Sequence, residues 1–265
     1  MRTIITALAL AAMAMTASGA LAQDSTPRRV IAIVAHPDDE VFIAPVLARL
    51  AREGAELTLV FATDGDQGPG VSGMEKGAAL ARVRQGEARC SAAALQASVT
   101  HFFGLGDGTL GTLAHLPDSS AQRFEAQLEA LLGGGDYDLA LTWGPDGGYG
   151  HADHRMVSAI TTEVIQRMGA GRPQLLYPGF RNGTLPPVPE IQSWATLDPA
   201  LLPIAMPYEP ADLAAASAAL QCHKTQFDET VRAGLIPLFD QSVWGGALHL
   251  REALAAPAIT PEMPG

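Results

Sequence analysis

Residues 29–40 read RVIAIVAHPDDE and place a cluster of polar side chains directly after a short apolar run. The run, 29–35, is rich in β-branched residues and shows no alternation of polar and apolar positions, which is typical of a strand buried on both faces. It ends at His36 and Pro37, so His36, Asp38 and Asp39 are expected at the carboxyl end of a buried strand.

The same alternation of apolar runs and helical patterns continues along the chain. Further strands are expected at 56–63, 99–105, 138–143 and 174–180. Helices are expected at 41–52, 74–96, 119–132, 151–168 and 211–225. Strands and helices that alternate through short connections indicate an α/β fold, a Rossmann-like and mostly parallel sheet with helices on both faces. The Pro-rich region 186–210 follows neither pattern, and we interpret it as a lid or a substrate-facing excursion.

The loops that follow these strands are the candidate site, because sheets of this kind bind ligands beyond the carboxyl ends of their strands. The polar loops are expected to converge on one rim, and they comprise residues 36–39, 64–65, 107–108 and 147–154. No Gly-x-Gly-x-x-Gly motif follows the first strand, which argues against a nucleotide-binding Rossmann enzyme.

Two of these loops combine histidines with carboxylates. His36 precedes the pair Asp38 and Asp39, and the second loop holds His151, Asp153 and His154. Adjacent carboxylates resist burial unless a cation compensates them. Two imidazoles and one carboxylate with an open fourth position form a catalytic zinc site, and a further carboxylate could accept a proton. Spacing alone leaves open which of the two aspartates binds metal, and such ligands also tolerate other divalent ions.

Two motifs, AHPDDE at 35–40 and HADH at 151–154, resemble the LmbE/PIG-L family of zinc-dependent N-deacetylases. Further matches follow in the family's order, and they are TDG at 63–65, RQGE at 84–87, GLGDG at 104–108, TWGP at 142–145 and HKTQ at 223–226. The resemblance covers roughly 30–226 and implies an LmbE-like fold.

The resemblance also implies catalytic roles. The residues implied to bind Zn²⁺ are His36, Asp39 and His154. Asp38 would then be the general base, while His151 would stabilise the oxyanion or protonate the leaving amine, with Asp153 orienting it.

The resemblance also implies that three residues contact the substrate. Arg84 and Asp107 match positions that contact sugar hydroxyls, and Tyr149 is placed like an aromatic ring that closes over the sugar. The alternatives are structural: an Arg84–Glu87 ion pair on a helix surface, turn chemistry at Asp107, and a loop-anchoring role for Tyr149. In the same way, His223 and Gln226 are candidates for supporting rather than contacting roles.

The first 22 residues have the pattern of a signal peptide. Arg2 provides a positive start, residues 3–21 carry no charge, and Ala20-Leu21-Ala22 is a small-x-small cleavage pattern. We expect 1–22 to be a cleaved leader and 23–265 to be a single domain, exported to the periplasm or secreted; a retained membrane anchor is the alternative. In an exported chain, Cys90 and Cys222 are either a disulfide or two buried small hydrophobes.

The net charge of the chain disfavours some classes of binding partner. The chain has 265 residues and a net charge of −11, which disfavours nucleic acid and anionic lipid surfaces. No later run after the leader is long and apolar enough to span a bilayer. We expect the protein to be a zinc-dependent hydrolase that removes an acyl group from an amino sugar. The expected acyl group is N-acetyl, and the substrate is either a small molecule or a glycan. The alternatives are an amidohydrolase acting on another acylated metabolite and a non-catalytic zinc- or carbohydrate-binding module.

Overall fold

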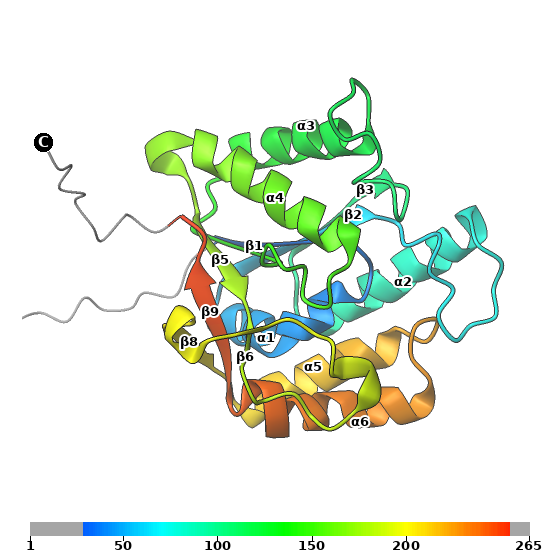
Figure 1. Cartoon of the computed structure of the whole chain (residues 1–265), viewed down its shortest axis with the longest axis vertical. Coiled ribbons are helices and arrows are strands. Elements are labelled where there is room, and N and C mark those ends of the chain that lie inside the picture. The colour runs from blue at the N-terminus through cyan, green and yellow to red at the C-terminus, as the bar shows by residue number, and fades with distance from the viewer. Residues whose placement is uncertain (1–28, 255–265) are drawn as a thin grey trace, which may run out of the picture.

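A computed structural model describes residues 29–254, so the leader expected at 1–22 lies outside the described residues. A seven-stranded sheet forms the centre of the molecule (Figure 1), in the order β3-β2-β1-β4-β5-β9-β8. Its strands are β1 (Arg29–Val34), β2 (Glu56–Thr63), β3 (Val99–Leu105), β4 (Leu139–Thr142), β5 (Gln174–Pro178), β8 (Ile204–Pro207) and β9 (Ala247–Glu252). Strands β1 to β5 pair in parallel, and β9 pairs antiparallel with both β5 and β8. The expectation of a mostly parallel α/β sheet is confirmed.

Helices cover both faces of this sheet, as Figure 1 shows. One face carries α1 (Ala44–Arg52), α2 (Ala78–Ala94), α5 (Pro210–Cys222) and α6 (Glu229–Phe239). The other face carries α3 (Ser120–Gly133) and α4 (Ala152–Arg167). Strand β1 packs against both layers: Val30 and Ala32 belong to the first core, whereas Ile31 and Ile33 belong to the second. Because residues 30–34 of β1 are buried on both faces, their side chains need to be apolar, which explains the unbroken apolar sequence.

Several elements differ from those expected. A 3-10 helix at Asp39–Ile43 precedes α1, and α2 begins at Ala78 rather than 74. The fifth strand stops at Pro178, and β6 (Phe180–Arg181) pairs with β7 (Thr196–Leu197) in a separate small sheet. The region 186–210 also contains 3-10 turns at Pro189–Ile191 and Pro199–Leu201 before β8. Helix α6, the π-helical turn Asp240–Trp244 and β9 were not expected from the sequence.

Cys90 and Cys222 are joined by a disulfide, with Cα atoms 5.7 Å apart. The bond connects α2 to the last residue of α5. Of the two alternatives expected for these cysteines, a disulfide or two buried small hydrophobes, the disulfide is therefore the one observed.

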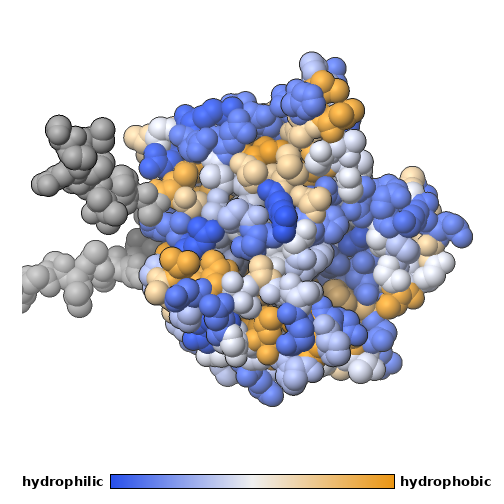
Figure 2. All heavy atoms as spheres, viewed as in Figure 1, coloured by the Kyte–Doolittle hydropathy of each residue, from blue (hydrophilic) through white to orange (hydrophobic). Residues whose placement is uncertain are grey.

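The face of the molecule drawn in Figure 2 is largely polar. Figure 2 shows hydrophobic side chains in small separate groups, one of them over the loop between β3 and α3, where Leu113 and Leu116 are exposed. Among the described residues, no helix combines the length and the apolar character that crossing a bilayer requires.

Candidate active site

The loops after β1, β3 and β4 bring their histidines and carboxylates into direct contact. Nδ1 of His36 lies 3.2 Å from Nε2 of His154, and that Nε2 lies 3.1 Å from Oδ1 of Asp39. Nδ1 of His36 is 3.6 Å from Oδ2 of Asp39. Ligand atoms held about 2.0–2.1 Å from one tetrahedral ion are about 3.3 Å apart. The three side chains therefore lie close enough together to be candidate ligands of one divalent metal ion, with Oδ1 of Asp39 toward His154 and Oδ2 toward His36.

Other combinations of side chains also meet here. His36, His151 and His154 can offer three nitrogens to one ion, and His36, Asp107 and Asp153 form a second possible group. Burial acts to lower the pKa of His36, but the carboxylates of Asp107, Asp153 and Asp39 outweigh it and raise that pKa well above its usual value. The same carboxylates favour a metal cation on this ring in place of the proton.

Asp39 is oriented by three N–H donors. Its Oδ2 accepts from the backbone amides of Ala35 and His36, at 3.0 and 2.9 Å, and from the indole of Trp143 at 3.3 Å. Oδ1 is thereby directed at His154. Burial opposes ionisation, yet His154 and His36 hold the pKa of Asp39 well below its usual range. Asp39 is therefore anionic, with one oxygen bound to the protein and the other facing His154.

His154 is held in the orientation a metal ligand needs. Its Nδ1 lies 3.1 Å from the carbonyl oxygen of Gly147, which can only accept, so Nδ1 carries the proton and Nε2 presents a lone pair. The ring also stacks on Trp143, with centroids 4.3 Å apart and planes 8° from parallel.

Asp38 points beside this group rather than into it. Its Oδ2 lies 3.4 Å from Nη2 of Arg84. Burial raises the pKa of Asp38 to about 6, although the Arg84 charge acts to lower it. A carboxylate with this pKa is ionised at neutral pH and can still accept a proton readily.

Arg84 is buried, with 3% of its surface exposed, and its guanidinium is bound to the protein. Nη1 donates to the carbonyl of Gly65 at 2.8 Å, and Nη2 donates to that of Pro37 at 2.6 Å. A Cβ at position 65, where φ is +65°, would lie 2.3 Å from Nη1, so glycine is required there. The alternative of an Arg84–Glu87 surface pair is wrong, because Glu87 is buried and accepts from Thr225. Contact between Arg84 and a sugar stays a prediction.

His151 caps the N-terminus of α4. Its Nδ1 accepts from the backbone amide of Asp153 at 3.2 Å, which leaves the proton of the neutral ring on Nε2. Burial and the neighbouring rings of His36 and His154 lower the pKa of His151, which favours the neutral ring. The carboxylate of Asp153 is used elsewhere: it accepts from the amides of Gly108 and Leu110 and lies 3.4 Å from Nε2 of His36. The orienting contact to His151 thus comes from the Asp153 backbone.

The remaining two expected residues border the same site. Oδ1 of Asp107 lies 3.0 Å from Nε2 of His36. Tyr149 is 43% exposed, and its ring centre is 4.9 Å from that of His154. Burial and the nearby carboxylates of Asp39 and Asp38 raise the pKa of Tyr149, so its hydroxyl stays a donor. Substrate contacts by Asp107 and Tyr149 stay predictions.

Glu40 and Ser91 are site residues that sequence reasoning missed. The carboxylate of Glu40 is fully buried and accepts from the amide of Asp38, Oγ of Ser91 and Nε2 of His223. The available signal was a third consecutive acid after a buried strand, which needs partners from elsewhere in the chain. His223 thus supports a buried carboxylate of the site, which is the supporting role considered for it from the sequence. Gln226 donates to the carbonyl of Gly68 at 2.8 Å.

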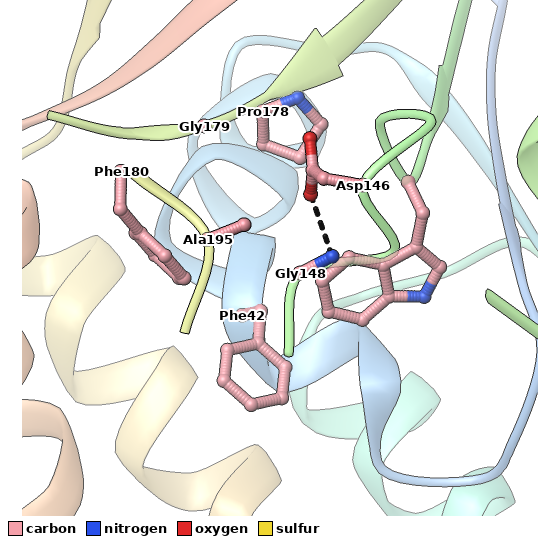
Figure 3. Close-up of a pocket in the computed structure, with 8 residues that line it drawn as sticks. Phe42, Asp146, Gly148, Pro178, Gly179, Phe180 and Ala195 are labelled. Carbon is pink, nitrogen blue, oxygen red and sulfur yellow. Dashed lines mark hydrogen bonds between the residues drawn. The ribbon is translucent and has the colours of Figure 1, made fainter. Parts of the chain in front are cut away.

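A small apolar cavity adjoins the site (Figure 3). Its walls include Phe42, Phe180 and the indole of Trp143, and Asp146 lies at its edge, bonded to the amide of Gly148. Its volume of about 20 Å³ suits roughly one water, so it does not accommodate a substrate group as it stands. Ala195, from the Pro-rich region, donates to the carbonyl of Gly148 at 2.8 Å. That region therefore braces the loop that carries Tyr149 and His151.

Fold and site together define an α/β protein with a buried His/Asp cluster that could hold a metal ion at the carboxyl edge of its sheet. The sequence model described as PIG-L, GlcNAc-PI de-N-acetylase, matches residues 31–165. The chain belongs to this family.

Relatives within it are named as deacetylases of 1D-myo-inositol 2-acetamido-2-deoxy-alpha-D-glucopyranoside. The protein from Corynebacterium glutamicum (strain R) is 34% identical over an alignment of 172 residues that covers 59% of this chain and 58% of the relative. The protein from Nakamurella multipartita is 33% identical over 162 residues, covering 52% of this chain and 55% of the relative. The chain thus spans less than two thirds of the length of these relatives.

Solved structures show the same fold. The N,N'-diacetylchitobiose deacetylase of Pyrococcus horikoshii superposes with a TM-score of 0.63 at 17% identity, covering 85% of this chain and 84% of that one. The 4-carboxy-2-hydroxymuconate hydratase of Pseudomonas putida gives 0.62 at 17% identity, covering 89% and 100%. Because the fold carries both a deacetylase and a hydratase, the reaction must be argued from the side chains.

Proposed function

We propose that this protein is an exported, zinc-dependent deacetylase that removes an N-acetyl group from an amino sugar. The observation that carries the proposal is the trio His36, Asp39 and His154, with donor atoms 3.1–3.6 Å apart and Asp38 beside them. Those three side chains would hold the Zn²⁺. A bound ion would polarise the acyl carbonyl and make an adjacent water more acidic.

Asp38 accepts the proton of the attacking water in this proposal. The water oxygen bonds to the carbonyl carbon, and the carbonyl oxygen becomes an oxyanion. The neutral His151 ring, with its proton on Nε2, is a donor suited to that oxyanion. Its lowered pKa favours this role over protonation of the amine. Asp38 then returns its proton to the leaving nitrogen as the carbon–nitrogen bond breaks, which yields acetate and a free amine.

An amino-sugar substrate is supported by the relatives, whose named substrate carries an acetamido group on a glucopyranoside. The polar rim formed by Asp107 and the hydroxyl of Tyr149 is chemically suited to sugar hydroxyls. Export is supported by the leader pattern at 1–22 and by the Cys90–Cys222 disulfide, because disulfides persist in oxidising compartments.

The test is acetate release from four substrates: N-acetylglucosamine, chitin fragments, peptidoglycan fragments and N-acetylglucosaminyl-inositol. Zinc-loaded protein should release acetate from at least one of them, chelation should abolish the release, and added Zn²⁺ should restore it. Asp38→Asn is the matched control for contaminating activity. Failure of the zinc-loaded protein on all four would refute the amino-sugar assignment, and turnover that survives complete metal removal would refute the metal dependence.

A further inference from the structure

The backbone of Asp38 has an unusual conformation for a residue with a side chain, with φ at 113° and ψ at −22°. Such conformations persist only where the surroundings impose them. Here both hydrogen-bonding groups of the peptide unit between Pro37 and Asp38 are held by buried side chains. The carbonyl oxygen of Pro37 accepts from Arg84 at 2.6 Å, and the amide of Asp38 donates to Oε2 of Glu40 at 3.0 Å.

These two contacts control where the Asp38 carboxylate points. The angle φ of Asp38 is the rotation about its N–Cα bond, between that peptide unit and the carbon that bears the side chain. The other side of this bond is held as well, because the carbonyl of Asp38 accepts from the amide of Val41 at 3.1 Å, so with the peptide unit held at its oxygen and nitrogen the angle φ is fixed. A carboxylate that must reach one particular water benefits from this restriction, because proton transfer depends on placement within fractions of an ångström.

Glu40 is in turn held from its other side. Its Oε1 accepts from Oγ of Ser91 at 2.5 Å and from Nε2 of His223 at 2.6 Å, and all three side chains are buried. Oε2 is left to face the Asp38 amide. The two supporting donors come from segments distant in the sequence, since Glu40 and His223 are 183 positions apart.

The disulfide ties these supports together. Ser91 directly follows Cys90, and His223 directly follows Cys222. The bond between the cysteines therefore fixes the separation of the two segments that supply both donors to Glu40. The covalent link lies at the exposed side of α2, whereas the hydrogen bonds lie in the interior.

We propose that Glu40 is a positioning residue that, supported by Ser91 and His223, holds the Pro37–Asp38 peptide unit so that Asp38 faces the reacting water. This inference rests on the proposed function, in which Asp38 accepts the proton. Glu40 acts through Asp38 and needs no contact with the substrate.

The first test compares Glu40→Ala with Glu87→Ala. Glu87 is the matched control, because it is also a buried carboxylate between α2 and the segment after α5, bonded to Thr225 and not to Asp38. In a crystal structure of Glu40→Ala we expect φ of Asp38 to become negative, and in Glu87→Ala to stay positive. A positive φ retained in Glu40→Ala would overturn the inference, whatever the substrate proves to be.

Kinetics provide the second readout. Glu40→Ala should lower kcat by about 10–100-fold, while KM and bound metal change by less than about threefold. Glu87→Ala should keep kcat within about threefold of the wild type. Glu40→Gln retains an oxygen that can accept from the Asp38 amide, so it should recover a large part of kcat. A fall in metal content parallel to kcat would contradict the positioning role. Should Glu40→Ala not fold, Ser91→Ala is the milder variant, and it should lower kcat severalfold without loss of metal.

A double-mutant cycle separates this inference from the proposed function. In an Asp38→Asn background, Glu40→Ala should cause no further loss of residual turnover, because the group it positions is already absent. An undiminished effect would mean that Glu40 acts by another route. Full activity of Asp38→Asn alone would instead remove Asp38 as the base, while φ in the Glu40→Ala structure would still decide what Glu40 holds.

Discussion

Nδ1 of His36 lies 3.2 Å from Nε2 of His154, although 118 positions separate the two residues in the sequence. The His154 nitrogen presents a lone pair, because the other nitrogen of its ring faces a backbone carbonyl. Oδ1 of Asp39 lies 3.1 Å from the same atom. Lone pairs at these distances need a hydrogen or a metal ion between them, and the site can provide either.

Replacement of His154 should therefore remove the metal. With one of three ligands lost, His154→Ala should retain less than about a fifth of the wild-type zinc after dialysis, measured by elemental analysis. His101→Ala is the matched control, because His101 borders a surface hollow with Arg29 and Glu56 outside this cluster. Undiminished zinc in His154→Ala would exclude it as a ligand.

Asp38→Asn should separate chemistry from metal binding. The amide cannot accept a proton but keeps nearly the same size, so bound zinc should stay near wild type while kcat falls by about 10²–10⁴-fold. Parallel measurement of zinc content and acetate release checks this. Wild-type kcat in the variant would transfer the base role to another group.

The acid side of the pH profile should report Asp38. A base must be deprotonated to work, so activity is present above the pKa of Asp38 and is lost as the pH falls through it. Burial raises that pKa to about 6 in the protein alone, and a cation bound nearby would lower it again. We expect kcat/KM to decline only at or below about pH 6. Because the Arg84 charge acts to lower this pKa, Arg84→Met should move the decline to higher pH, and a shift to lower pH would contradict the assignment.

The disulfide should contribute to stability. It closes a loop spanning 132 positions, and removal of a native disulfide commonly costs about 2–5 kcal/mol. Urea unfolding of the Cys90→Ser, Cys222→Ser double variant should give a free energy of unfolding lower by that amount. Added reductant should destabilise the wild type and leave the double variant unchanged, and equal effects on both would point to another cause.

A buried carboxylate joins α1 to α5. Asp212 accepts from Arg52 at 2.8 and 3.0 Å and from the amide of Glu209 at 2.8 Å. Burial acts against ionisation, but Arg52 holds the pKa of Asp212 below its usual value. A lowered pKa stabilises the folded state above the unfolded pKa and loses that contribution as the pH falls through the folded pKa. Asp212→Asn should lower the free energy of unfolding by about 1–3 kcal/mol at pH 7, with a smaller difference in acid; a constant difference across pH would contradict this.

Much of the sheet was predictable because its signals are local. The bounds of β2 and β3 agree with the expected strands, and β1 differs only at its last residue. The elements after position 226 were not predicted, since α6 contains Pro237 and continues into a π-helical turn, both of which break a regular helical pattern. The Pro-rich region forms short strands and turns whose pairing depends on distant partners.

The site divides in the same way. His36, Asp39 and His154 were recognisable because metal ligands belong to few residue types and follow strand ends. Their convergence on one rim was expected, and the structure places them within 3.6 Å of one another. The burial of Arg84 against the Pro37 carbonyl and the pairing of Glu40 with His223 were not recognisable from the sequence.

The sequence by itself determined the order of strands and helices from β1 to β5 and the two motifs that carry the candidate ligands, because short-range periodicity and residue chemistry are properties of the chain alone. Only the tertiary structure decided which carboxylate turns toward the histidines and which turns aside. That choice depends on the partners that surround each aspartate. Trp143 donates to Asp39 and Arg84 lies beside Asp38, and packing rather than sequence neighbourhood brings both to the site. Glu40 accepts from the nearby Asp38 amide, but the donors that hold Glu40 in place, Ser91 and His223, come from distant segments.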